Sequence, residues 1–97
     1  MEKGRVAHSP LFLVRFVKIS GTFVACVATV APKKIAKTAV QRNRIRRKLY
    51  EAVRSFRGDI QPGMHILVFA KPALLVVSQK DITADLKALF VKASIMR

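Results

Sequence analysis

Apolar and polar residues alternate from Leu11 to Lys18, which is the pattern of a β-strand with two different faces. Phe12, Val14 and Phe16 fall on one face, and the other face includes Arg15 among apolar neighbours. The pattern predicts a strand whose Phe side chains belong to the core. Stacking of the two Phe rings on unpaired bases is the alternative.

A second strand is predicted over Thr22–Ala31, because this stretch is rich in Val and apolar on both faces. Such a strand belongs at the centre of a sheet, covered on both sides. The turn signal Ser20-Gly21 predicts that it pairs antiparallel with the strand before it. Pro32 ends the strand, and Cys26 is expected to be a small side chain in the core.

A long helix is predicted to begin after Thr38, which has capping-box spacing with Gln41. Gly58 is placed to be the residue just past the end of this helix. Apolar residues at helical spacing predict the face that it buries. They are Ile45, Leu49, Ala52, Val53 and Phe56.

A third strand over His65–Ala70 and a last helix capped by Ser78, with Asp81 at its third position, complete the chain. The buried face of that last helix is predicted to be Ile82, Leu86, Leu89 and Phe90. The order strand, strand, helix, strand, helix predicts one small α+β domain over residues 1–97, with a mixed sheet packed against helices.

The net charge of the chain limits the classes of function that are possible. Nineteen Lys and Arg oppose five Asp and Glu, giving a formal net charge of +14, so a polyanionic partner is expected. The longest apolar stretch, 22–32, is too short for the roughly 20 residues of a membrane-spanning helix. Because the chain has a single cysteine and no signal-peptide pattern, a reducing cytoplasm is the expected compartment.

The positive charge is concentrated around the start of the long helix. No acidic residue lies between Lys33 and Lys48, whereas an ordinary solvated helix face mixes both signs. This asymmetry favours a nucleic-acid interface over a merely solvated face. Asn43 stands between Arg42 and Arg44. Its amide suits a base edge, a 2′-hydroxyl or a metal-bound water, or it simply supports the first turn of the helix.

Catalytic and metal-binding patterns are absent from the sequence. Asp81 is explained by helix capping rather than by a metal pair with Asp85, and Glu51 by an ion pair with its basic neighbours. His8 and His65 have no partner at ligand or triad spacing. We therefore expect no catalytic residue, metal or cofactor in the chain itself.

The stretch Pro32–Val53, PKKIAKTAVQRNRIRRKLYEAV, resembles the signature of the bacterial ribonuclease P protein subunit. Downstream, Ile66–Ala73 is similar to the family's later strand and basic-Pro-Ala turn. The matching residues in the signature are Lys33-Lys34, Ala39-Val40, Arg42-Asn43-Arg44, Ile45, Arg46-Arg47, Leu49 and Glu51-Ala52.

The resemblance implies an accessory subunit of a ribonucleoprotein endonuclease that removes the 5′ leader from precursor tRNA. A large RNA subunit would hold the Mg²⁺ ions and perform the cleavage. It also implies a left-handed strand–helix–strand crossover, in place of the usual right-handed one. The residues expected to contact the RNA subunit are Lys33, Lys34, Lys37, Arg42, Asn43, Arg44, Arg46, Arg47 and Lys48.

By the same resemblance, the sheet would bind the single-stranded leader, with Phe12, Phe16 and Lys71 as expected members of that face. Family members usually begin with a further basic helix, and the segment Met1–Arg5 corresponds to the residues after it. We therefore expect the chain to lack that helix. The main rival is a structural or chaperone-type RNA-binding protein, similar to a ribosomal protein, and a membrane-surface basic protein is third.

Overall fold

The structure is a computed structural model, and it describes residues 4–19, 21 and 24–96. Four strands and two α-helices follow one another along the chain, with two short 3-10 helices at Arg57–Asp59 and Pro72–Val76. The main elements are β1 (Arg5–His8), β2 (Phe12–Lys18), β3 (Cys26–Val30), α1 (Ala39–Arg54), β4 (Met64–Ala70) and α2 (Gln79–Lys92).

The four strands form one mixed sheet in the order β1-β2-β4-β3. β2 pairs antiparallel with both β1 and β4, whereas β3 runs parallel to β4. The predicted α+β fold with a mixed sheet is confirmed. The connection from β3 through α1 to β4 is a crossover between parallel strands, and its left-handed sense stays a prediction.

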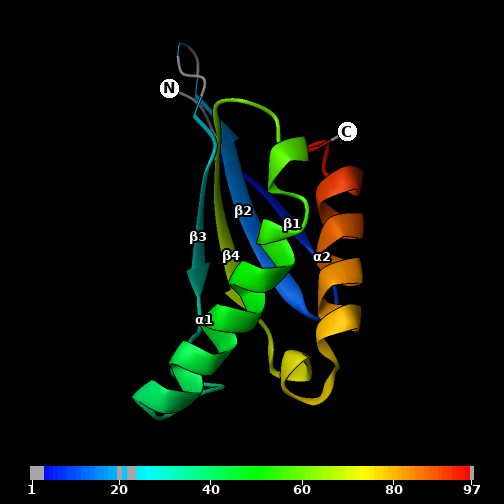
Figure 1. Ribbon diagram of the computed structural model, residues 1–97. Helices are drawn as coiled ribbons and strands as arrows, with labels where there is room; N and C mark the ends of the chain where they lie inside the picture. The colour runs from blue at the N-terminus through cyan, green and yellow to red at the C-terminus, as the bar shows by residue number, and fades with distance from the viewer. Residues whose placement is uncertain (1–3, 20, 22–23, 97) are drawn as a thin grey trace.

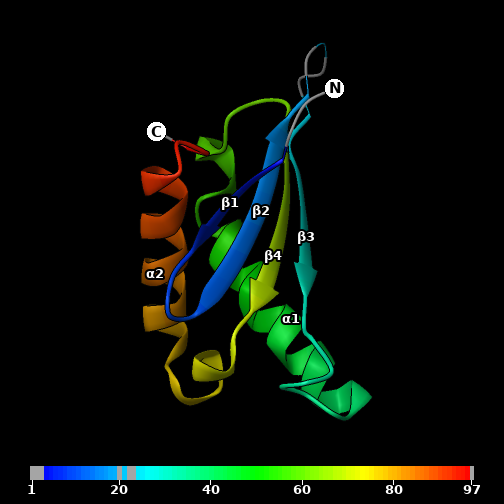
Figure 2. The same cartoon turned by 180° about the vertical axis from the view of Figure 1, so that it is seen from behind.

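Both helices lie on the same side of the sheet, and among the described residues no helix covers the opposite side (Figures 1 and 2). The core fills the space between the sheet and the helices. Its largest fully buried side chains include Phe12 from β2, Leu49 from α1 and Phe90 from α2. Phe56 and Phe90 meet edge to face, with ring centroids 5.4 Å apart, and so help to hold the two helices together.

Alternation along β2 and β4 decides which side chains face the helices. Phe12, Val14 and Phe16 of β2 are buried, as are Ile66 and Val68 of β4. The side chains at the alternate positions of these strands, and those of β3 in register with them, point to the uncovered side. We call this side the open face. It comprises Leu13, Arg15 and Val17 of β2, Cys26, Ala28 and Val30 of β3, and His65, Leu67 and Phe69 of β4.

Both helices carry the predicted apolar stripes into this core. Ile45, Leu49, Ala52 and Val53 of α1 are buried, and Phe56 just beyond the helix is buried too. In α2 the four predicted residues, Ile82, Leu86, Leu89 and Phe90, are all buried. The hydroxyl of Ser78 accepts a hydrogen bond from the Asp81 amide, so the predicted cap of α2 is also confirmed.

The prediction for the second strand is wrong in its position and its pairing. β3 spans only Cys26–Val30, lies at the edge of the sheet and pairs with β4 alone. Residues 22–23 of the predicted strand lie outside the described residues. Because β4 is inserted between β2 and β3, the local turn signal at Ser20-Gly21 could not fix the pairing, although Gly21 has the positive φ of +82° that suits a turn.

Three smaller predictions also need correction. Cys26 is exposed rather than buried, since it lies on the open face of an edge strand. α1 ends at Arg54 with Ser55 as its C-cap, so Gly58 falls inside the 3-10 helix beyond it. β1 lies before the first predicted strand, in a segment for which the sequence pattern predicted no element.

Candidate nucleic-acid interface

The start of α1 is fixed by a complete capping box. The Thr38 hydroxyl accepts a hydrogen bond from the Gln41 amide at 3.1 Å, and the Gln41 side chain accepts one from the Thr38 amide at 3.3 Å. The same Gln41 oxygen also accepts a hydrogen bond from the Lys37 amide at 3.1 Å. These bonds satisfy amides that a helix start leaves unpaired, and they hold the preceding segment against the helix.

Arg42 fixes that segment a second time. Its Nη1 atom donates hydrogen bonds to the carbonyl oxygens of Ala36 and Lys37, each at 3.2 Å. Ala36 is fully buried, so the turn before the helix is anchored in the core as well. Arg42 therefore positions the segment that carries Lys33, Lys34 and Lys37.

The nine residues predicted to contact RNA lie on this segment and on the part of α1 that does not face the core. We call them the basic surface. Seven of them are exposed, and Arg42 and Lys48 are half-buried. The exposed members are Lys33, Lys34, Lys37, Asn43, Arg44, Arg46 and Arg47.

Almost no carboxylate neutralises this surface. Within the described residues the single ion pair joins Glu51 to Arg54, at 3.6 Å, one turn beyond the last member of the basic surface. It confirms the ion pair predicted for Glu51. The first turn of α1 contains no acidic residue, so the partly positive end of the helix adds to the field of the cations. A phosphate backbone would find several unpaired cations and a helix start together.

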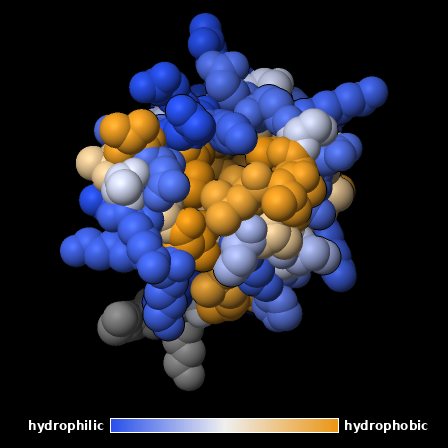
Figure 3. Space-filling view, turned by 90° about the horizontal axis from the view of Figure 1, so that it is seen from below, coloured by the Kyte–Doolittle hydropathy of each residue, from blue (hydrophilic) through white to orange (hydrophobic). Residues whose placement is uncertain are grey.

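The end of the sheet at which α1 begins combines apolar and hydrophilic surface. α1 begins at the lower end of the molecule in Figure 1, where β3 and β4 also finish. Seen from below, apolar residues gather in a hollow at the centre of this end, and hydrophilic side chains project around it (Figure 3). Leu75 and Val76, in the 3-10 helix after β4, are among the exposed apolar residues of the chain.

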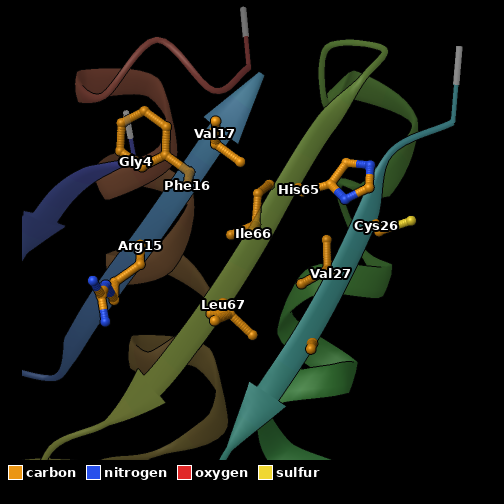
Figure 4. Close-up of a pocket in the computed structure, with 10 residues that line it drawn as sticks. Gly4, Arg15, Phe16, Val17, Cys26, Val27, His65, Ile66 and Leu67 are labelled. Atoms are coloured by element: carbon orange, nitrogen blue, oxygen red, sulfur yellow. The ribbon is translucent and has the colours of Figure 1, made fainter. Parts of the chain in front are cut away.

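The open face of the sheet holds a cleft with a volume of about 380 Å³. Arg15, Val17, Cys26, His65 and Leu67 line it from three adjacent strands (Figure 4). Arg15 brings a positive charge to a largely apolar lining, and His65 is the register partner of Cys26. Such a cleft suits a ligand that has both apolar parts and a negative charge.

The structure corrects the residues expected to bind the leader. Phe12 has no exposed surface, and Phe16, which is only 9% exposed, borders the cleft without offering a free ring. Both rings point toward the helices because they share the buried face of β2, so the core interpretation is the right one. Lys71 is half-buried, and its Nζ atom donates a hydrogen bond to the Ser9 carbonyl at 2.8 Å. A role of Lys71 in binding stays a prediction.

Sequence reasoning missed Arg15 and Leu67 as candidate binding residues. The signal was present, since a charged residue in the middle of a strand marks the face that meets water. Arg15 marks the open face in this way. What the pattern could not show is that the helices leave this face of the sheet uncovered.

The carboxylate of Asp85 stabilises the fold through a hydrogen bond. Asp85 accepts a hydrogen bond from the Ser9 hydroxyl, which ties α2 to the turn before β2. Among residues 4–19, 21 and 24–96, no three His, Cys, Asp or Glu side chains come close enough together to hold a metal ion. In the same part of the chain, no helix has the length and apolar character needed to cross a membrane.

Comparison with known proteins gives a consistent picture. The family model described as Ribonuclease P matches residues 1–94. The ribonuclease P protein component of Synechococcus elongatus is 33% identical over 97 residues, covering 96% of this chain and 80% of that protein. The corresponding component of another Synechococcus strain is 34% identical over 70 residues, covering 72% of this chain and 53% of that protein.

Solved structures show the same fold. A Staphylococcus aureus RNase P protein mutant with defective mRNA degradation activity superposes with a TM-score of 0.86 at 22% identity, covering 97% of this chain and 78% of that one. The RNase P protein from Thermotoga maritima gives a TM-score of 0.79 at 24% identity, covering 90% of this chain and 81% of that one.

Proposed function

Because this chain belongs to the ribonuclease P protein family, we propose that it is the accessory protein subunit of a ribonuclease P ribonucleoprotein acting in the cytoplasm. The holoenzyme would be an endoribonuclease that removes the 5′ leader from precursor tRNA. Its RNA subunit would hold the Mg²⁺ ions and perform the cleavage.

The observation that carries the proposal is the basic surface. It combines exposed cations, a positive helix start without acidic residues in its first turn, and an almost complete absence of carboxylates on one side of the molecule. In the proposal this surface binds the RNA subunit. Each phosphate that a Lys or Arg neutralises releases counterions, so binding should depend strongly on salt.

Arg42 has a double role in the proposal. Its side chain adds one positive charge, and its two hydrogen bonds hold the segment with Lys33, Lys34 and Lys37 in place. Asn43, exposed between Arg42 and Arg44, offers an amide to a base edge or a 2′-hydroxyl of the same RNA.

The leader of the precursor tRNA is assigned to the open face. Arg15 would contact its backbone, while Leu67, 41% exposed, and the neighbouring cleft residues would pack against its bases. The open face thus replaces the buried Phe12 and Phe16 as the proposed leader-binding region.

Salt dependence of RNA binding tests the role of the basic surface. We expect the logarithm of affinity for a bacterial ribonuclease P RNA to fall steeply with the logarithm of salt concentration. The double variant Arg44→Gln/Arg47→Gln should make that slope shallower by roughly 1 to 2 units, because two phosphate contacts are lost. Lys87→Gln/Lys92→Gln removes the same charge from exposed positions of α2 and is the matched control.

The slope of the control should stay that of the unmodified chain. Equal slopes for all three proteins would contradict the assignment of RNA binding to α1. Equal affinity for the ribonuclease P RNA and for an unrelated structured RNA of the same length would favour a general RNA-binding protein instead.

A further inference from the structure

Tyr50 is an aromatic residue on the outward side of the basic helix. Its side chain is 54% exposed, although α1 buries every apolar residue of its predicted stripe. It is the only tyrosine in the chain. An exposed aromatic residue among the cations of this helix needs an explanation, because Lys, Arg or Glu would form the helix more readily at that position.

The Tyr50 side chain makes no hydrogen bond or ring contact within the described part of the fold. In the described part of the chain, the single aromatic ring pair is Phe56 with Phe90, and the Tyr50 hydroxyl has no hydrogen-bond partner. The contact between α1 and the start of α2 lies elsewhere on the helix: the Lys48 carbonyl accepts a hydrogen bond from the Gln79 side chain at 2.9 Å. Two residues further on, Tyr50 lies about 160° around the helix from Lys48.

Cations border Tyr50 on both sides along the helix. Arg46 lies one turn before it and Arg54 one turn after it, at the four-residue spacing that brings side chains together. Arg47, three residues before Tyr50, is a further neighbour and is exposed. The result is a flat, accessible ring between cationic side chains, of which Arg54 is paired with Glu51.

We propose that Tyr50 stacks on an unpaired base of the RNA bound to the basic surface, while Arg46 and Arg47 hold the adjacent phosphates. This inference rests on the proposed function, since it assigns a base-stacking position within the same RNA-binding helix. The chemistry selects an unpaired nucleotide in a loop, bulge or single strand, because the face of a paired base is covered by its neighbours in a duplex. Stacking accepts any base, so it adds affinity without reading sequence.

Substitution of Tyr50 separates stacking from charge. Tyr50→Leu removes the ring but keeps an apolar side chain and favours the helix, so the domain should unfold at the same or higher urea concentration. Its affinity for a bacterial ribonuclease P RNA should fall roughly tenfold, the scale of one lost base–aromatic stack. Tyr50→Phe keeps the ring and should recover most of that loss.

The slope of affinity against salt is the readout that identifies stacking. It should be unchanged in Tyr50→Leu, because no phosphate contact is lost, whereas Arg47→Gln should make it shallower. Undiminished affinity of Tyr50→Leu, beside a shallower slope for Arg47→Gln, would overturn the stacking site and leave the RNA-binding helix standing. If neither variant changed binding, the basic surface itself would be refuted.

Tyrosine fluorescence gives an independent readout. With one tyrosine and no tryptophan in the chain, the emission reports on Tyr50 alone. Saturation with the ribonuclease P RNA should quench it, after correction for RNA absorbance by a parallel titration of N-acetyltyrosinamide. Full emission at saturated binding would overturn the proposal.

Discussion

Arg42 stabilises the fold and, in the proposal, also belongs to the RNA interface. Its Nη1 atom bonds two carbonyl oxygens of the segment before α1, so charge alone does not describe its contribution. We expect Arg42→Lys to weaken binding to the ribonuclease P RNA about fivefold at constant net charge, the equivalent of roughly one lost hydrogen bond. A filter-binding titration at fixed salt would measure the effect.

The matched control for this prediction is Arg57→Lys, the same exchange at an exposed position outside the basic surface. Its affinity should not change. If Arg42→Lys also bound normally, the two hydrogen bonds would have no influence on the interface, and charge alone would explain the role of Arg42.

Individual residues were predictable from sequence where local spacing decides their environment. The capping pair Thr38 and Gln41 is an example, because both partners lie within one turn. Cys26 was not predictable in the same way. Its burial depends on which strand pairs beside it and on which face the helices cover, and both depend on contacts distant in sequence.

At the scale of elements, α1 joins the core and the interface through its two faces. Leu49 has no exposed surface, so Leu49→Ala should lower the free energy of unfolding by about 2–5 kcal/mol. Val40, on the outward face, is 68% exposed, and Val40→Ala should change it by no more than about 0.5 kcal/mol. Urea unfolding of both variants measures the difference; similar small effects would mean that the buried face is assigned wrongly.

Element positions followed from the sequence better than element pairing. Helical spacing identified both helices, since it is a local property of the chain. The sequence did not predict that β3 lies at the sheet edge. A central strand and an edge strand with an apolar open face have the same apolar sequence pattern, so the pattern cannot distinguish them. β1 was missed because four residues are too few to establish a period.

At the scale of the whole molecule, the proposal assigns two surfaces of the chain, the basic surface and the open face, to two different RNAs: the RNA subunit and the leader of the precursor tRNA. Arg15 lies on the open face, whereas Lys18, three residues along the same strand, alternates to the other side. Arg15→Gln should reduce the affinity gained from a 5′ leader, measured as the ratio of binding to precursor and mature tRNA in the presence of the RNA subunit. We expect a reduction of about two- to fivefold, typical of one exposed charge contact.

Lys18→Gln removes the same charge from the other face and should leave that ratio unchanged. A ratio that responds equally to both substitutions would show that leader binding depends on net charge, and the open face would lose its proposed role.

The most direct test of the accessory-subunit proposal is the rate of precursor-tRNA cleavage by a bacterial ribonuclease P RNA at low Mg²⁺, with and without this chain. We predict a clear increase in rate with the chain, and loss of that increase with Arg44→Gln/Arg47→Gln but not with Lys87→Gln/Lys92→Gln. Tight, salt-dependent RNA binding without any increase in cleavage would contradict the proposal and identify the chain as an RNA-binding protein of another kind.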